Sequence, residues 1–105
     1  MSSAIVESND IIDFGKVADG EIVTKTFTLP NKHNAILKVI GTGASCGCTK
    51  PSVAETILQP GEETTVTIEF NSKGKKGLNK KNVYIQYTIQ NKPYILYQYF
   101  TANVV

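Results

Sequence analysis

Apolar and polar residues alternate along most of this 105-residue chain, and this pattern constrains the fold more than any other feature. Successive side chains of a β-strand point to opposite faces, so alternation with a period of two predicts strands with one buried face. In residues 64–70, for example, Val66, Ile68 and Phe70 alternate with threonines and a glutamate. No segment shows the 3.6-residue period of an amphipathic helix. We therefore predict an all-β protein.

Turn signals divide the chain into about seven such runs. Gln59-Pro60-Gly61-Glu62 fits a type II turn, because proline sets φ at the second position and glycine accepts a positive φ at the third. Strands are predicted at residues 11–14, 22–29, 36–42, 53–58, 64–70, 82–89 and 94–105. Short strands with frequent turns are typical of an immunoglobulin-like antiparallel β-sandwich, and a five- or six-stranded barrel is the alternative. An antibody-type core is excluded, because the chain has no tryptophan and its two cysteines are one residue apart.

The length and composition fit one globular domain. A chain of 105 residues buries one core and is too short for two. We expect the sandwich over residues 11–105, preceded by a flexible segment or short edge strand over residues 1–10. A hydrophobic content of 41% argues against disorder. No apolar run approaches the ~18 residues of a membrane span, and the N-terminal residues lack the features of a signal peptide.

The charge argues against a nucleic-acid partner. The net charge is only +2, and all eleven positive residues are lysines. Phosphate and guanine are recognised by the planar guanidinium fork of arginine, which this chain lacks. We therefore expect a protein partner if the chain has one.

Cys46 and Cys48 form the motif that most suggests chemistry. In an extended strand their Cα atoms would be about 6.5 Å apart, near the limit for a disulfide, and a bend at Gly47 could shorten this distance. Two thiolates could also form half of a soft-metal site, for Cu(I) for example. The third interpretation is that the cysteines pack in the core as small hydrophobic residues. All three interpretations stay open at this point.

Two further groups of residues could bind a partner. The first is a lysine- and glycine-rich loop predicted at residues 71–81, in which Lys75 and Lys76 are adjacent; such loops are mostly solvated tips. The second is Tyr84, Tyr97 and Tyr99, which face outward if the even-numbered residues of the last strand face the core. Exposed tyrosines are frequent at protein interfaces. The opposite facing would bury Tyr97 and Tyr99.

No catalytic set is recognisable. The only histidine, His33, lies in a predicted turn and has no evident nucleophile or orienting partner. There is no glycine-rich phosphate loop, zinc spacing or calcium loop. We therefore expect neither enzymatic activity nor a cofactor.

Several motifs together resemble a bacterial family, the domain-of-unknown-function family numbered fifteen-seventy-three, over residues 11–105. The matching residues are Asp13-Phe14-Gly15-Lys16-Val17, Gly20-Glu21, Phe27, Asn31, Leu37, Val39, Ser45-Cys46-Gly47-Cys48-Thr49, Pro60-Gly61-Glu62, Phe70 and Lys73-Gly74-Lys75-Lys76-Gly77. The chain departs from the family pattern at His33, where we expect glycine, at Ile36, where we expect proline, and at Gln98, where we expect an apolar residue.

The resemblance implies an immunoglobulin-like sandwich akin to PapD-like, major-sperm-protein and Hydin-type domains. It also implies a Bacteroidetes-type protein located outside the cytoplasm, in the periplasm or at the cell surface, and it brings no established activity. The expected function is a non-enzymatic module that binds another protein or has a structural role in the envelope. The alternative is a thiol-redox or copper-binding domain centred on Cys46 and Cys48.

Overall fold

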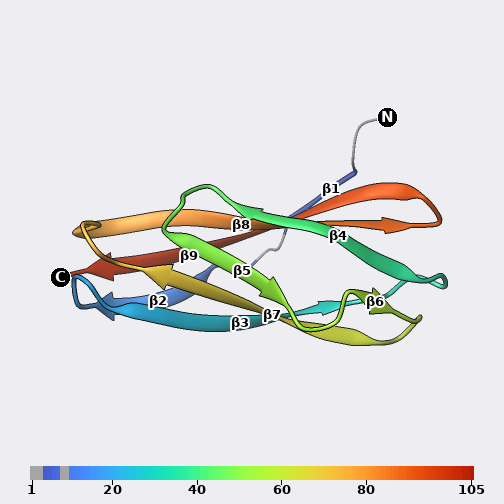
Figure 1. The fold of residues 1–105 in the computed structure, drawn as a ribbon, viewed down its shortest axis with the longest axis horizontal. Coiled ribbons are helices and arrows are strands. Elements are labelled where there is room, and N and C mark those ends of the chain that lie inside the picture. Colours follow the sequence, from blue (N-terminus) through green and yellow to red (C-terminus); the bar gives the residue numbers. More distant parts are fainter. Residues whose placement is uncertain (1–3, 8–9) are drawn as a thin grey trace.

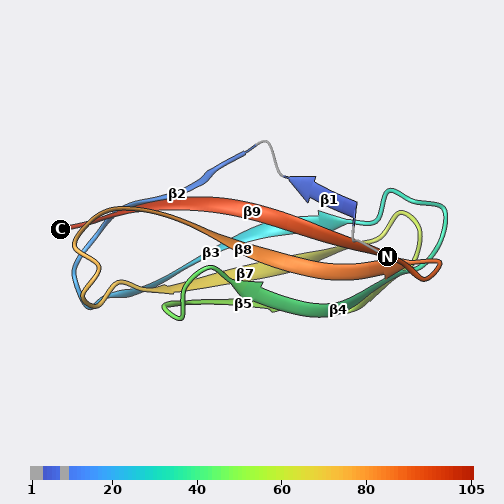
Figure 2. The ribbon, with the colours of Figure 1, turned by 90° about the horizontal axis from the view of Figure 1, so that it is seen from above.

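A computed structural model describes residues 4–7 and 10–105, and this part of the chain forms two packed β-sheets without a helix (Figure 1). The strands are β1 (Ala4–Glu7), β2 (Ile12–Val17), β3 (Ile22–Pro30), β4 (Leu37–Ala44), β5 (Thr49–Val53), β6 (Ile57–Leu58), β7 (Glu63–Asn71), β8 (Gly77–Ile89) and β9 (Lys92–Val104). In Figure 1, β8, β9 and β4 lie above β5, β7 and β3, and Figure 2 looks onto the two layers so that they overlap. The predicted all-β class and sandwich arrangement are confirmed.

The larger sheet has the order β1-β9-β8-β4-β6, and the smaller sheet has the order β3-β7-β5. Strands β1 and β2 share one edge of the larger sheet: β1 runs parallel to the first part of β9, and β2 runs parallel to its last part. The other strand pairs are antiparallel. The N-terminal segments therefore cover an edge of β9 that would otherwise be open to pairing.

The core lies between the sheets and has two parts. Phe70 of β7 and Phe100 of β9 are fully buried, and Phe14 of β2 packs against both rings with centroid distances of 6.1 Å and 5.2 Å. Aliphatic side chains fill the other part, including Leu37, Val66 and Ile85. Burying each of these large side chains contributes about 1.5–3 kcal/mol, so the inward-facing residues of β7, β8 and β9 supply most of the driving force.

The facing of β9 settles which tyrosines point outward. Phe100, Ala102 and Val104 are buried, which confirms the facing with the even-numbered residues inward. Gln98 belongs to the same inner set although it is polar. Its Nε2 donates hydrogen bonds to the backbone oxygens of Asp10 (2.8 Å) and Tyr99 (3.0 Å). These bonds offset the cost of burying the amide.

Several predicted strand boundaries were wrong. The strand predicted to end before Gly15 continues to Val17, because Gly15 takes a positive φ of 72° in a bulge of β2. The weak strand predicted at 53–58 is replaced by β5 and β6. Pro51 is tolerated in β5 because this strand lies at the edge of its sheet, where a missing N–H breaks no ladder.

The predicted lysine loop at 71–81 is also shorter than expected. β8 begins at Gly77, so Lys80 and Lys81 belong to a strand and pair with Thr101 and Phe100 of β9. The segment 78–82 is mostly polar and lacks an alternating pattern, so only its pairing with the well-patterned end of β9 makes it a strand. The resulting hairpin has 13 residues in each strand.

Candidate functional site

The outer face of the β8–β9 hairpin carries the three tyrosines singled out in the sequence. Tyr84 lies opposite Tyr97 in the antiparallel register, and their ring centroids are 6.1 Å apart. Tyr99 is two residues further along β9, and the Nζ atom of Lys80 lies 5.9 Å from its ring centroid, within cation–π range. All three tyrosines are half-buried. We call Tyr84, Tyr97 and Tyr99 the tyrosine face.

Two glycines of β4 make room for this face, and they were not singled out in the sequence. Gly43 pairs with Tyr84 and Gly41 pairs with Gln86. A Cβ atom on Gly43 would overlap the Tyr84 phenol ring, and one on Gly41 would lie 2.7 Å from Oε1 of Gln86. The Tyr84 ring therefore lies across the β4 backbone, between Gly43 and Tyr97. Glycines inside a predicted strand are the signal that could have revealed this close approach.

Apolar side chains extend the tyrosine face toward β1. Ile95 precedes Tyr97 on the same side of β9, and Ile5 of β1 pairs directly with Ile95. Ile5 is 67% exposed, which is unusual for a large aliphatic side chain on a sheet face. Contiguous exposed apolar and aromatic residues mark surfaces that bind other molecules. The outer face of the larger sheet therefore has the composition of an interface.

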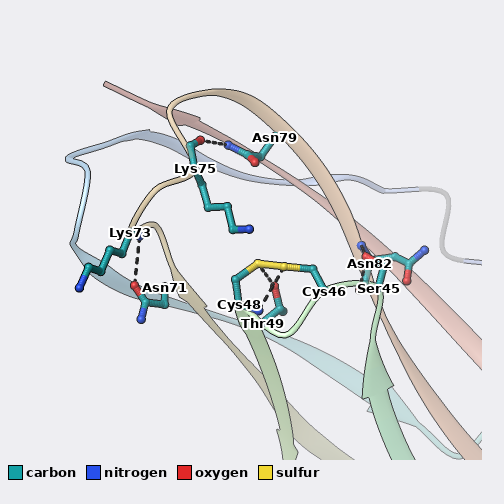
Figure 3. The surroundings of a disulfide bond; sticks show 9 residues. All are labelled: Ser45, Cys46, Cys48, Thr49, Asn71, Lys73, Lys75, Asn79 and Asn82. Carbon is teal, nitrogen blue, oxygen red and sulfur yellow. Dashed lines mark hydrogen bonds between the residues drawn. A yellow bond between two sulfur atoms is a disulfide. The ribbon is translucent and has the colours of Figure 1, made fainter.

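The structure joins Cys46 and Cys48 in a disulfide bond in the turn between β4 and β5 (Figure 3). Their Cα atoms are 5.3 Å apart, closer than in an extended strand, because the Thr49 N–H donates to the Cys46 carbonyl oxygen at 3.2 Å and closes a turn. The Cys48 N–H donates to Cys46 Sγ at 3.1 Å, and Thr49 Oγ1 lies 3.6 Å from Cys48 Sγ. In this bonded form neither sulfur is a thiolate available to a metal.

The other predicted binding residues, the two lysines and the two cysteines, lie in two different connections between strands. Lys75 and Lys76 are in the connection between β7 and β8, and Figure 3 shows the Lys75 side chain extending toward the disulfide. Lys76 is exposed. The cysteine turn is fastened to the tyrosine hairpin at Ser45, whose N–H donates to the Asn82 carbonyl oxygen at 3.0 Å. Ser45 Oγ also accepts a hydrogen bond from the Asn82 N–H at 3.1 Å.

His33 lies in an aromatic cleft between the two sheets that the sequence did not predict. Its ring packs on Tyr94 with a centroid distance of 5.6 Å, and Tyr94 stacks on Tyr87 at 5.2 Å. The cleft has a volume of about 440 Å³, and Phe27 and Leu29 line it on the side of β3. Burial raises the pKa of Tyr87, and the neighbouring Tyr94 raises it further.

Over residues 4–7 and 10–105, no group of three or more histidine, cysteine, aspartate or glutamate side chains could hold a metal ion. Within the same part of the chain, no helix has the length and apolar character needed to cross a membrane.

Comparison with solved structures shows the same fold in longer proteins. A structure of a protein of unknown function from Porphyromonas gingivalis W83 aligns with a TM-score of 0.75 and 15% identity, covering 96% of this chain and 44% of that chain. The structure of the Vibrio cholerae VesB protease aligns with a TM-score of 0.69 and 14% identity, covering 96% of this chain and 30% of that chain. This chain thus spans less than half of either protein, and at these identities the likeness shows the fold alone.

No curated protein matches the sequence. A family model does match it, over residues 5–104, and its description is "Protein of unknown function (DUF1573)". The match covers nearly the whole chain. This chain therefore belongs to the DUF1573 family.

Proposed function

We propose that this chain is an immunoglobulin-like module without catalytic activity that binds another protein outside the bacterial cytoplasm. The observation that carries the proposal is the tyrosine face, an outward-facing aromatic cluster on the two longest strands. Tyrosine supplies a large apolar contact area together with a polar hydroxyl, at the entropic cost of ordering only two torsions. For this reason tyrosine is enriched in the centre of protein interfaces.

The rigidity of the tyrosine face supports a role in binding. Tyr84 is held between Gly43 on one side and Tyr97 on the other, and both tyrosines stand on central strands of the larger sheet. Their side chains are therefore ordered before a partner arrives. Such preorganisation lowers the entropic cost of association.

The disulfide supports a location outside the cytoplasm. Disulfides persist in oxidising compartments, such as the bacterial periplasm and the cell surface, and are rare in the reducing cytosol. Both cysteines of this chain are in one bond.

The test compares the tyrosine face with the opposite sheet. Immobilised wild-type protein and the double variant Tyr84→Ala/Tyr97→Ala are incubated with envelope extract from the encoding bacterium, and captured proteins are quantified by mass spectrometry. A matched control, Thr24→Ala/Thr26→Ala, removes exposed side chains from β3 of the smaller sheet. Circular dichroism verifies that each variant is folded.

We expect at least one protein whose capture falls more than tenfold with the tyrosine variant and is unchanged with the threonine variant. Central aromatic residues of an interface typically contribute about 2 kcal/mol or more each, so a tenfold loss is a conservative expectation. Equal capture by all three proteins, or loss only with the threonine variant, would exclude the tyrosine face as the binding surface.

A further inference from the structure

We propose that the Cys46–Cys48 disulfide is redox-active and oxidises one pair of thiols on another protein by stoichiometric thiol–disulfide exchange. This activity goes beyond the proposed binding function and does not depend on the tyrosine face. It rests on three features of the cysteine turn: the small ring that the bond closes, the access to the sulfurs, and the polar groups around them.

The bond closes a ring of only three residues, so it adds little to the stability of the fold. A disulfide stabilises a protein mainly by restricting the unfolded chain, and this effect grows with the length of the loop that is closed. The turn is also held by other contacts. Thr49 N–H donates to the Cys46 carbonyl oxygen, and Asn71 N–H donates to the Cys48 carbonyl oxygen at 2.8 Å. The chain can therefore be reduced without losing the turn.

The two sulfurs are accessible from different sides. Cys46 lines an open hollow of about 540 Å³ together with residues of β4 and β5, whereas Cys48 lines a second hollow of about 380 Å³. Gly47 is exposed and borders both hollows, and a Cβ atom there would meet nothing within 4 Å. An incoming thiolate must approach along the S–S axis, and Cys46 borders the larger of the two hollows. Cys48 packs against the phenylalanine part of the core, which makes its sulfur the less accessible one.

Groups around Cys48 favour it as the leaving group, although the Cys48 N–H, 3.1 Å from Cys46 Sγ, would also stabilise a thiolate on Cys46. Cys48 Sγ lies 3.6 Å from the Thr49 hydroxyl, which can donate a hydrogen bond to a thiolate. Lys50 and Lys73 line the same hollow with one carboxylate, Glu69. Figure 3 shows the Lys75 side chain extending toward the disulfide, whereas the Lys73 ammonium group points away from it. Nearby positive charge lowers the pKa of a thiol, and a thiol of lower pKa leaves faster.

The exchange proceeds in two balanced steps. A thiolate of the partner attacks Cys46 Sγ, the bond between Cys46 and Cys48 breaks, and its electron pair leaves on Cys48 Sγ. A second thiolate of the partner then attacks the partner sulfur of this mixed disulfide and releases the Cys46 thiolate. The partner dithiol is oxidised to a disulfide, and its two electrons and two protons end on Cys46 and Cys48.

The test uses reduced glutathione as the attacking thiol and the cyclic peptide of residues 44–49 as the matched control for ring size. Acid-quenched samples are analysed by mass spectrometry for the rate of opening and for the cysteine that carries glutathione. We expect the folded protein to react several-fold faster than the peptide, with glutathione on Cys46. The variant Lys50→Gln/Lys75→Gln should react about threefold more slowly, because it removes positive charge near the leaving sulfur. The control variant Lys32→Gln/Lys92→Gln removes the same amount of positive charge at positions far from the cysteine turn along the chain. It should leave the rate unchanged.

Three results would overturn the proposal. These are a reaction no faster than that of the peptide, attachment of glutathione mainly to Cys48, or equal slowing by both lysine variants. Thermal unfolding of the reduced protein is a further check. We expect the midpoint to fall by only a few degrees on reduction, whereas unfolding at room temperature on reduction would show a structural staple instead of a redox-active bond.

Discussion

The two faces of the β8–β9 hairpin are made from alternate residues of the same strands, yet they differ completely in their surroundings. The inward-facing side chains of Val83, Ile85 and Phe100 are 0% exposed. Tyr84 and Tyr97, on the outer face of the same two strands, are only half-buried. Folding requires the inner residues to be apolar, because they supply the burial that stabilises the sandwich. It places no such demand on the outer residues. Under the proposed function, the aromatic composition of the outer face serves the binding of a partner.

The largest expected effect is a difference in the free energy of unfolding between two single variants, at adjacent residues on opposite faces of β9. Phe100→Ala should lower the free energy of unfolding by about 3–5 kcal/mol, because it leaves a cavity beside Phe14 and Phe70. Tyr99→Ala should cost about 1 kcal/mol, since it removes a partly exposed ring and its contact with Lys80. Urea unfolding measures both. Equal losses in the free energy of unfolding would show that the outer face stabilises the fold as much as the inner face does.

The second effect concerns the one amide on the inner face of β9. Gln98→Ala should lower the free energy of unfolding by about 1–3 kcal/mol, because it removes the hydrogen bonds to the backbone oxygens of Asp10 and Tyr99. Gln98→Leu restores apolar volume and should recover less than half of this loss. If the leucine variant is more stable than the wild type, the inner face is stabilised by apolar side-chain volume at this position and not by these hydrogen bonds.

The third effect tests how Tyr84 is positioned. Gly43→Ala should cost about 1–2 kcal/mol in chemical unfolding, because the added methyl group overlaps the Tyr84 ring and forces it to move. In the double variant Gly43→Ala/Tyr84→Ala this conflict is absent, so the two costs should not add. Strict additivity would mean that the ring does not lie across Gly43.

The smallest effect is a pH dependence from the aromatic cleft. Burial raises the pKa of Tyr87 in the folded protein, so above about pH 10 the unfolded chain loses this proton while the folded protein keeps it. The resulting contribution to stability is complete below pH 10 and is lost as the pH rises toward the folded-state pKa. Tyr87→Phe should therefore show a shallower fall in stability between pH 9 and 11. Identical slopes for the two proteins would exclude Tyr87 as the cause.

Most of the sandwich was predictable because its core strands alternate cleanly. Residues 64–70 show this best, since Val66, Ile68 and Phe70 are each buried as the pattern predicts. The start of β8 was not predictable, because residues 78–82 have no apolar alternation and become a strand only through pairing with β9. The bond between Cys46 and Cys48 was one of three interpretations, since sequence spacing does not show whether the turn brings the two sulfurs together.

The candidate site was predictable only in part. The outward facing of Tyr97 and Tyr99 was one of two facings that the sequence left open, because Gln98 interrupts the even-numbered apolar residues of β9. The contribution of Gly43 was missed, because strand register decides which residue lies opposite a glycine, and register depends on contacts between distant segments. The His33–Tyr94–Tyr87 cluster was missed for the same reason.

The most direct test of the two-face account is side-chain footprinting of the protein with and without a captured partner. Hydroxyl radicals modify exposed tyrosine rings, and mass spectrometry quantifies the modification of each ring. We predict that modification of Tyr84 and Tyr97 falls several-fold in the complex, while modification of Tyr94, in the cleft between the sheets, is unchanged. Protection of Tyr94 with unchanged modification of Tyr84 and Tyr97 would contradict the account and place the partner in the cleft.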